Sequence, residues 1–365
     1  MKIVPQKQPR GIALIIVMVT IFVLAVLAGA FAFSMKVETK LARNASYETE
    51  LEWLGRSGVE LAKYVLALQA NSPNEPYDSL NQVWAGGPGS VLSSNSPLSS
   101  ITLKDHKFKL GNGTFQVTVT DLERKFNINA VVNTPDILNQ AFILMGVDAA
   151  EYPQIIASIQ DWVDTDDDPH IGGAESDYYE GLKPAYLAKN GPIDDLSELL
   201  LIKGITPEIY WGSGSTNVPQ PTVAAPQNPF SSATVMSNTV GLVDLFTPIS
   251  SGKLNLNTVS AQTLQLIPGL DQNMASTIIL LRVGPDGVDG TEDDTPFGGA
   301  GGRVGDALRQ ATGSGGGPLA SLFTDRSSTF EVQVDVEISG YHKHYVAIIG
   351  RNSAQDIQTL VFREK

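Results

Sequence analysis

An uninterrupted apolar stretch from Ile12 to Phe33 constrains this chain more than any other feature of its sequence. The stretch, IALIIVMVTIFVLAVLAGAFAF, contains neither charged residues nor proline. With a helical rise of ~1.5 Å per residue it is long enough to cross the ~30 Å hydrocarbon core of a bilayer. Lys2, Lys7 and Arg10 precede it, and positively charged flanks of this kind stay in the cytoplasm. We therefore expect a single-pass membrane protein with a cytoplasmic N-terminus, whose remaining residues lie across the membrane in a periplasm-like space.

Three interpretations of this stretch are open. The first is a cleaved secretory signal, for which residues 28–30 and 30–32 offer small-x-small cleavage sites. The second is a plain signal anchor. The third is a short basic leader that is cut after Gly11 and leaves the apolar helix on the mature protein. The junction between Gly11 and Ile12 resembles the leader of type IV prepilins.

The residues after the apolar stretch favour the third interpretation. Residues 34–69 contain no proline and consist mainly of good helix formers, so one helix is expected from about residue 13 to residue 69. A cleaved signal would not be continued by such a helix. Apolar positions spaced three and four residues apart predict that its second half packs on a globular head. These positions are Leu51, Leu54, Gly58, Leu61, Val65 and Leu68.

Strands are predicted on both sides of a long helical region. Alternation of apolar and polar residues predicts them at residues 101–110, 114–122, 329–338, 341–349 and 355–363. A two-stranded hairpin is only marginally stable alone, so we expect the first two strands to join the last three in one antiparallel sheet packed on residues 34–69. The predicted fold class is α+β, in which a pilin-like long helix covers an antiparallel sheet that a large helical insertion interrupts.

The predicted domains follow from these elements. They are residues 1–11, a leader; 12–33, a transmembrane helix; 34–125, the first part of the head; 126–320, a helical insertion; and 321–365, the C-terminal strands. Helices are expected in the insertion at residues 135–145, 153–163, 195–201, 207–210, 260–267 and 274–282. Stretches rich in Gly, Ser or Pro are expected to be loops at residues 71–100, 212–229, 298–302 and 313–317.

The clearest chemical signal is a run of acidic residues after the predicted helix 153–163. When Asp164 is counted as position one, carboxylates fall at positions one, three, five and twelve, which is the ligand spacing of an EF-hand. Carboxylates clustered without a cation repel one another. We therefore predict a calcium site formed by Asp161, Asp164, Asp166, Asp168, Glu175 and Asp177. Pro169 stands where an EF-hand has glycine, so the backbone path is expected to differ. The alternative is a solvated acidic loop whose Asp residues cap neighbouring helices.

Two weaker signals concern other candidate ligands. The second acidic run, residues 286–294, matches no regular ligand spacing, and a turn-rich surface loop is favoured there over a second calcium site. His342 and His344 share one face of a predicted strand, and a solvent-facing pair is favoured over a metal site.

Residues 260–282 look like a helix-hairpin-helix with the turn Pro268-Gly269-Leu270, and residues 198–210 look like a weaker copy. In DNA-binding examples the backbone amides of such a turn grip phosphates. Here Asp271 follows the turn directly and the chain carries a net charge of −14. Because phosphate binding depends on Lys and Arg, nucleic acid is disfavoured as a partner. The sequence also lacks cysteine and a phosphate-binding Gly-Lys-Ser/Thr motif, and no enzymatic activity is predicted.

Four segments carry a resemblance to a known family. They are the junction Gly11-Ile12, DLERKFNINAVV at residues 121–132, the block at residues 159–210 that contains DWVDTDDDPHIGGAESDYY, and LNLNTVSAQTLQLIPGL at residues 254–270. Together they resemble the general secretion pathway protein K family, the minor pseudopilins of type II secretion. The resemblance implies a pilin-like head with a helical insertion of the SAM or helix-hairpin-helix type, calcium in that insertion, and a location in the bacterial inner membrane with the head in the periplasm. It also implies cleavage and N-methylation at Ile12 by a prepilin peptidase.

The resemblance further implies a place at the tip of the secretion pseudopilus. Ordinary pilins carry Glu at mature position five, where it pairs with a neighbouring subunit; this position is Ile16 here. An unpaired carboxylate in lipid is costly, so an apolar residue suits a subunit with no neighbour above it. The implied partners are pseudopilins of the I and J type, the major pseudopilin and exported substrate. The alternatives are a minor pilin of a type IV pilus and a membrane-anchored DNA-binding protein.

Overall fold

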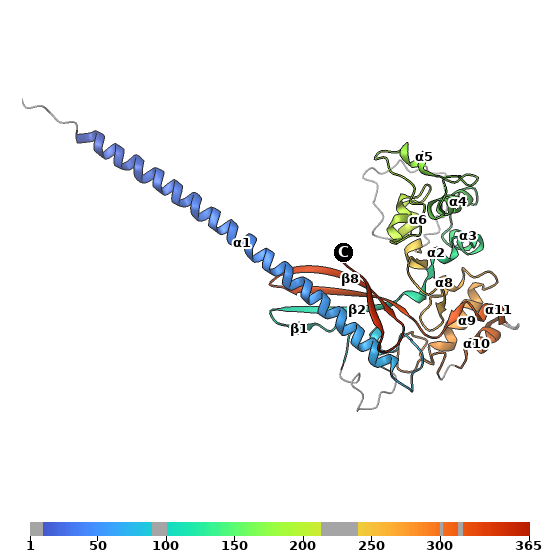
Figure 1. The fold of residues 1–365 in the computed structure, drawn as a ribbon. Coiled ribbons are helices and arrows are strands. Elements are labelled where there is room, and N and C mark those ends of the chain that lie inside the picture. The colour runs from blue at the N-terminus through green and yellow to red at the C-terminus, as the bar shows by residue number, and fades with distance from the viewer. Residues whose placement is uncertain (1–9, 90–100, 213–239, 300–301, 313–316) are drawn as a thin grey trace, which may run out of the picture.

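One helix, α1 (Arg10–Ala70), runs for 61 residues and projects as a rod from the rest of the molecule (Figure 1). The structure is a computed structural model that describes residues 10–89, 101–212, 240–299, 302–312 and 317–365. From Ile12 onward α1 is long and apolar enough to cross a membrane. The predicted continuous helix is therefore confirmed. Most of the predicted leader and of the predicted linker at residues 212–229 lies outside the described residues.

The second half of α1 packs on the sheet through the predicted apolar stripe. Leu51, Leu54 and Val65 are at most 4% exposed, and Val59, Ala62 and Leu66 extend the same buried face. Leu61 and Leu68 are half-buried at its border and pack against the same cluster. The spacing of three and four residues places all of these side chains on one side of the helix.

The sheet has five antiparallel strands in the order β1-β2-β7-β8-β9. They are β1 (Phe108–Leu110), β2 (Gly113–Asp121), β7 (Thr329–Ile338), β8 (Tyr341–Arg351) and β9 (Ile357–Glu364). The expected union of the first hairpin with the C-terminal meander is thus confirmed, since β2 pairs with β7 from Thr114–Glu337 to Asp121–Phe330. The expectation of a strand from residue 101 was wrong. A turn at residues 104–105, where Asp105 has a φ of 56°, delays the strand to Phe108.

The region between β2 and β7 is mainly helical. Its helices are η3 (Leu122–Arg124), α2 (Ile128–Val131), α3 (Pro135–Leu144), α4 (Tyr152–Val163), α5 (Ser176–Glu180), η4 (Leu196–Leu201), α6 (Pro207–Trp211), α7 (Leu242–Leu245), α8 (Ala261–Leu264), α9 (Gln272–Arg282), α10 (Val304–Thr312) and α11 (Gly317–Ala320). Two short parallel ladders join β3 (Phe126–Asn127) to β4 (Phe246–Thr247) and β5 (Leu254–Asn255) to β6 (Phe323–Thr324). The predicted helix at 260–267 shortens to α8, the segment 195–201 forms the 3-10 helix η4, and α10 was missed.

Two hydrophobic cores result from this arrangement. One lies between α1 and the sheet and includes Val65, Val117 and Phe330. The other extends from Phe126 to Phe323 and holds the helices between β2 and β7 together. Figure 1 shows these helices beside the sheet, at the end of α1 that is remote from the apolar span.

The two cores meet at Asp121, the last residue of β2. Its carboxylate is 1% exposed, and Oδ2 accepts hydrogen bonds from Ser327 Oγ at 2.6 Å, Thr258 Oγ1 at 2.5 Å and Asn255 Nδ2 at 3.2 Å. Burial, followed by repulsion from Glu123, raises the pKa of Asp121 to about 7. The segments DLERKFNINAVV and LNLNTVS, which stood out in the sequence, therefore touch each other at this carboxylate.

The close approach of α1 to the sheet gives a testable prediction. A Cβ atom on Gly58 would lie 2.5 Å from Val334 Cγ1, whereas a Cβ on Gly29 would meet nothing within 4 Å. We expect Gly58→Leu to lower the free energy of unfolding of the head by about 1–3 kcal/mol or more, because overpacking strains the interface. The matched variant Gly29→Leu should leave it unchanged. Urea unfolding of the full chain in detergent, followed by tryptophan fluorescence, measures both, and equal values would contradict the prediction.

Candidate metal centre

The acidic loop begins where α4 ends. Pro153 stands in the first turn of α4, and Ile155, Ile156, Ile159 and Trp162 are at most 5% exposed, so this face anchors the helix in the second core. Asp164 terminates α4 in an extended conformation, and α5 begins directly after Glu175. The loop at residues 164–175 is therefore fixed at both ends by helices.

Asp161, in the last turn of α4, organises this loop from the inside. Its side chain is fully buried. Oδ1 accepts a hydrogen bond from the backbone N–H of His170 at 3.0 Å and lies 2.6 Å from His170 Nδ1, while Oδ2 accepts from the N–H of Ala174 at 2.6 Å. A Cβ on Gly173 would lie 1.9 Å from Oδ2, so only glycine leaves room for this carboxylate.

Three other carboxylates converge, and three of their oxygens have no hydrogen-bond donor among the described residues. One oxygen each of Asp164, Asp166 and Glu175 lies within 4.8 Å of the others. Glu175 is 4% exposed, and neither of its oxygens has a hydrogen-bond partner within the described residues, nor does Asp164 Oδ1. Burial, followed by repulsion from Asp161 and Asp164, raises the pKa of Glu175 to about 7. Burial and the neighbouring Asp166 also raise the pKa of Asp164.

This arrangement fits a hard divalent cation. A buried polar group without a partner costs free energy, and two oxygens of Glu175 are in that state. Carboxylate oxygens gathered around one point are the ligands that calcium takes in proteins. A cation bound between Asp164, Asp166 and Glu175 would satisfy these oxygens and cancel their mutual repulsion.

The structure distributes the six predicted ligands over different roles. Asp161 and Asp164 form a second possible group with His170. Asp168 and Asp177 are exposed and belong to neither group; the backbone N–H of Asp168 donates to Asp166 Oδ1 at 3.0 Å. His170 was not among the predicted ligands, and its position inside the acidic run was the only sequence signal for it.

The backbone path of the loop departs from an EF-hand, as Pro169 predicted. The left-handed turn occurs at Gly172, with a φ of 85°. Lys203 Nζ holds this turn by donating to the carbonyl oxygens of Gly172 at 3.2 Å and Gly173 at 3.0 Å. The lysine of the weaker helix-hairpin-helix copy therefore supports the acidic loop.

The second acidic run has its own donors. The Asp289 carboxylate pairs with the guanidinium of Arg282, which also donates to the carbonyl oxygens of Leu256 at 2.6 Å and Val259 at 2.9 Å. Asp294 accepts from the N–H of Gly290 at 2.8 Å. These contacts are those of a turn-rich loop that braces α9.

The two remaining sequence signals also have structural explanations. At the Pro268-Gly269-Leu270 turn, the Asp271 side chain caps α9 by accepting from the N–H of Met274 at 2.8 Å, so a carboxylate stands where a phosphate would bind. His342 and His344 are exposed on β8. They lie opposite Glu337 and Asp335 of β7, which is the expected solvent-facing pair.

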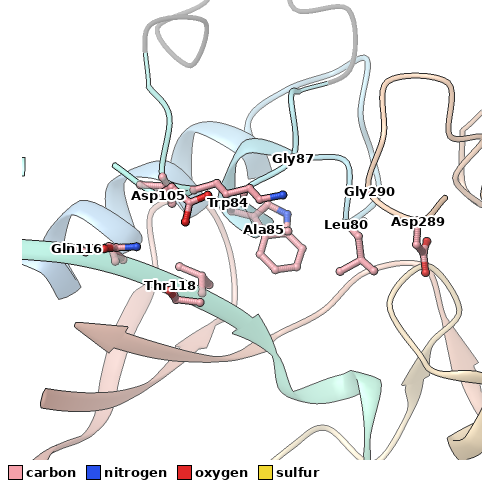
Figure 2. A pocket seen from close by; sticks show the side chains of 14 residues that line it. Leu80, Trp84, Ala85, Gly87, Asp105, Gln116, Thr118, Asp289 and Gly290 are labelled. Atoms are coloured by element: carbon pink, nitrogen blue, oxygen red, sulfur yellow. The ribbon is translucent and has the colours of Figure 1, made fainter. Parts of the chain in front are cut away.

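A pocket of about 380 Å³ lies beside β2, between that strand and the segment around Trp84. Figure 2 shows Gln116 and Thr118 of β2 on one side, with Leu80 and Asp289 at one end. Among the described residues its lining contains neither histidine nor cysteine, so those residues offer no nucleophile paired with an imidazole base. The pocket gives no support to an enzymatic function.

Comparisons with known proteins identify the relatives of this chain. Residues 124–211 match the family model described as Type II secretion system (T2SS), protein K. Type II secretion system protein K of Klebsiella pneumoniae is 27% identical over 215 residues, which cover 56% of this chain and 60% of that protein. A putative type II secretion system protein K of Escherichia coli K12 is 30% identical over 218 residues, with the same two coverages of 56% and 60%. The chain thus matches about 60% of the length of these relatives.

One solved structure shares the fold. A chain in the crystal structure of the GspK-GspI-GspJ complex from the enterotoxigenic Escherichia coli Type 2 Secretion System matches with a TM-score of 0.61 and 17% sequence identity. The match covers 89% of this chain and 99% of that chain. It confirms the long helix, the antiparallel sheet and the mixed α+β class.

The unsatisfied carboxylate of Glu175 predicts a specific dependence of stability on pH. In chelator, the raised pKa means that folded Glu175 holds its proton more tightly than the unfolded side chain, whose pKa is 4.5. The free energy of unfolding should therefore fall as the pH rises from about 4.5 to about 7, and then level off. Glu175→Gln should remove the part of this fall that Glu175 contributes and stabilise the metal-free chain at pH 8, whereas the part contributed by Asp121, whose pKa is also raised to about 7, should remain. Thermal unfolding of the full chain measures the effect, with the exposed Glu180→Gln as control. A destabilised Glu175→Gln variant at pH 8 would contradict it.

Proposed function

We propose that this chain is a member of the type II secretion system protein K family, a non-enzymatic minor pseudopilin that starts or caps the secretion pseudopilus. The observation that carries the proposal is α1. One uninterrupted helix supplies both an exposed apolar span from Ile12 to Phe33 and a buried stripe around Val65 that fixes the head. This design keeps a periplasmic head rigidly attached to an inner-membrane anchor, as assembly of a fibre from the membrane requires.

Two features support a position at the tip. Ile16, at mature position five of a chain that begins at Ile12, is apolar, so this subunit has no carboxylate to pair with a subunit above it. The helices between β2 and β7 add a second core beside the sheet (Figure 1). We propose that residues 126–320 form a domain of the SAM or helix-hairpin-helix type that is too bulky to repeat along a shaft.

The proposed partners are pseudopilins of the I and J type. The similar solved structure is a complex named for GspK, GspI and GspJ, which supports a tip assembly of this chain with two such subunits. The major pseudopilin below the tip, the prepilin peptidase and exported substrate complete the set. The minor pilin of a type IV pilus is disfavoured because the matched relatives are named for type II secretion. A nucleic-acid partner is disfavoured by the carboxylate of Asp271 at the helix-hairpin-helix turn.

The same proposal includes a structural calcium ion in the acidic loop. Asp164, Asp166 and Glu175 would hold it, and Asp161 keeps the loop in the shape that brings them together. When bound, the ion supplies positive charge that neutralises the three carboxylates. It would thereby stiffen the connection between α4 and α5.

Calcium titration of the full chain in detergent tests the ion. Calcium at about 100 times its Kd should stabilise the fold by about 2.7 kcal/mol, seen as a rise in melting temperature. Asp164→Ala combined with Asp166→Ala should abolish the rise. The matched control, Asp286→Ala combined with Asp293→Ala in the second acidic run, should retain it. A parent chain with no calcium-dependent shift would remove the ion from the proposal.

The tip position has a separate test. Mass spectrometry should find that the mature chain begins at Ile12, because cleavage after Gly11 leaves the apolar helix on the protein. The prepilin peptidase should also have methylated this new N-terminus. Gold labelling of the head should then mark one end of each assembled fibre. A mature chain that begins after Ala30, or label spaced along the whole fibre, would refute the proposed role.

A further inference from the structure

A polar cleft of about 640 Å³ lies at the end of α1 that is farthest from the apolar span. Ala70, the last residue of α1, forms part of its wall. Phe33 lies 37 residues earlier on the same helix, or about 55 Å at ~1.5 Å per residue. The other walls come from the segment before β5, the segment between β6 and β7, and the turn between β8 and β9. The cleft therefore lies on a part of the head that is remote from the apolar span.

Two cations in this cleft form no ion pair among the described residues, although Arg326 attracts the carboxylate of its neighbour Asp325. Lys253 and Arg326 are exposed and line the cleft. The chain has 39 acidic and 25 basic residues, yet neither side chain forms an ion pair with any residue that the structure describes. A third cation, Arg351, is 6% exposed in the same wall. Its guanidinium pairs with Asp78, but its Nη1 atom has no acceptor.

Among the described residues that line the cleft, Glu123 is the one carboxylate, and both of its oxygens already accept hydrogen bonds. Glu123 is 1% exposed. Its Oε1 accepts from Ser328 Oγ at 2.7 Å and the N–H of Ser251 at 3.4 Å, and its Oε2 accepts from the N–H of Ser328 at 2.7 Å. Glu123 is thus held against the wall by these donors, and the exposed charges of the cleft, on Lys253 and Arg326, are positive.

Hydroxyl groups add donors to the cations. Ser251 Oγ accepts from the N–H of Lys253 at 3.4 Å, and Ser353 Oγ accepts from the N–H groups of Gln355 at 3.3 Å and Asp356 at 3.1 Å. Because each oxygen already accepts from backbone, its own proton remains to be donated. The cleft therefore combines two exposed cations with hydroxyl donors, which is the chemistry that binds carboxylates.

We propose that this cleft binds the carboxylates of an acidic segment of a partner polypeptide. The volume decides between possible oxyanions. One water occupies ~30 Å³ in the liquid, so the cleft holds roughly twenty waters and a single inorganic oxyanion would leave most of it empty. An extended segment with two or more Asp or Glu side chains offers one carboxylate to each of Lys253 and Arg326, which both line the cleft. The proposal does not depend on a tip position or on calcium.

Fluorescence polarisation with the full chain in detergent tests this site. The probe is a labelled, C-terminally amidated peptide of four Glu residues, and its control is the same peptide with four Gln residues. The Glu peptide should bind at least tenfold more tightly. Lys253→Glu combined with Arg326→Glu should weaken its binding at least tenfold, and the neutral pair Lys253→Gln with Arg326→Gln should also weaken it. The matched control Lys109→Glu with Arg303→Glu changes two other exposed, unpaired cations and should alter binding less than twofold.

Each contrary result overturns the proposal. If the cleft variant and the matched control lose affinity for the Glu peptide equally, the peptide is attracted by the net charge of the chain alone. Inorganic phosphate that binds at this cleft while the Glu peptide does not would assign the site to a free anion. No preference for the Glu peptide over the Gln peptide at constant ionic strength would remove the site altogether.

Discussion

The buried carboxylate of Asp121 is the interaction on which the rest of the structure depends. A carboxylate at 1% exposure is tolerated only when donors surround it, and here they come from two distant parts of the chain. The segment at β5 supplies Asn255 and Thr258, and the segment before β7 supplies Ser327. Asn255 Nδ2 also donates to the carbonyl oxygen of Asp78 at 3.0 Å. The position of the second core relative to the sheet is therefore set by a hydrogen-bond network that is complete only when all these segments are in place.

The elements that the sequence predicted are those with a strong local period. The stripe around Val65 and the alternation in β2, β7 and β8 each repeat over two or more turns or pleats. The pattern of apolar residues is therefore enough to indicate which face is buried. The elements that it missed depend on distant partners. The two-residue ladder of Leu254 and Asn255 with Phe323 and Thr324 has no period to detect. The expected strand at residue 101 failed because Asp105 adopts a left-handed conformation that alternation does not reveal.

At the candidate metal centre, residue spacing predicted that carboxylates converge in this loop but not the role of each oxygen. Asp164, Asp166 and Glu175 converge as an EF-hand-like spacing suggests. Asp161 has the same side chain, yet its oxygens are occupied by the N–H groups of His170 and Ala174. Whether a carboxylate faces an ion or the backbone depends on where the chain turns. That turn is set by Gly172, three residues after the proline that interrupts the EF-hand pattern.

The two acidic runs show why composition alone does not define a cation site. Both contain closely spaced carboxylates. In the second run, Arg282 lies within reach of Asp289 and backbone amides serve Asp294, so each of these charges is balanced by the protein itself. In the first run no cation of the chain forms an ion pair with Glu175 among the described residues, and its two oxygens lack partners. The ammonium of Lys203 contacts this loop, but it donates to the carbonyl oxygens of Gly172 and Gly173. The first run is thereby left with carboxylate oxygens that no donor among the described residues serves, and this contrast with the second run is the observation behind the proposed calcium site.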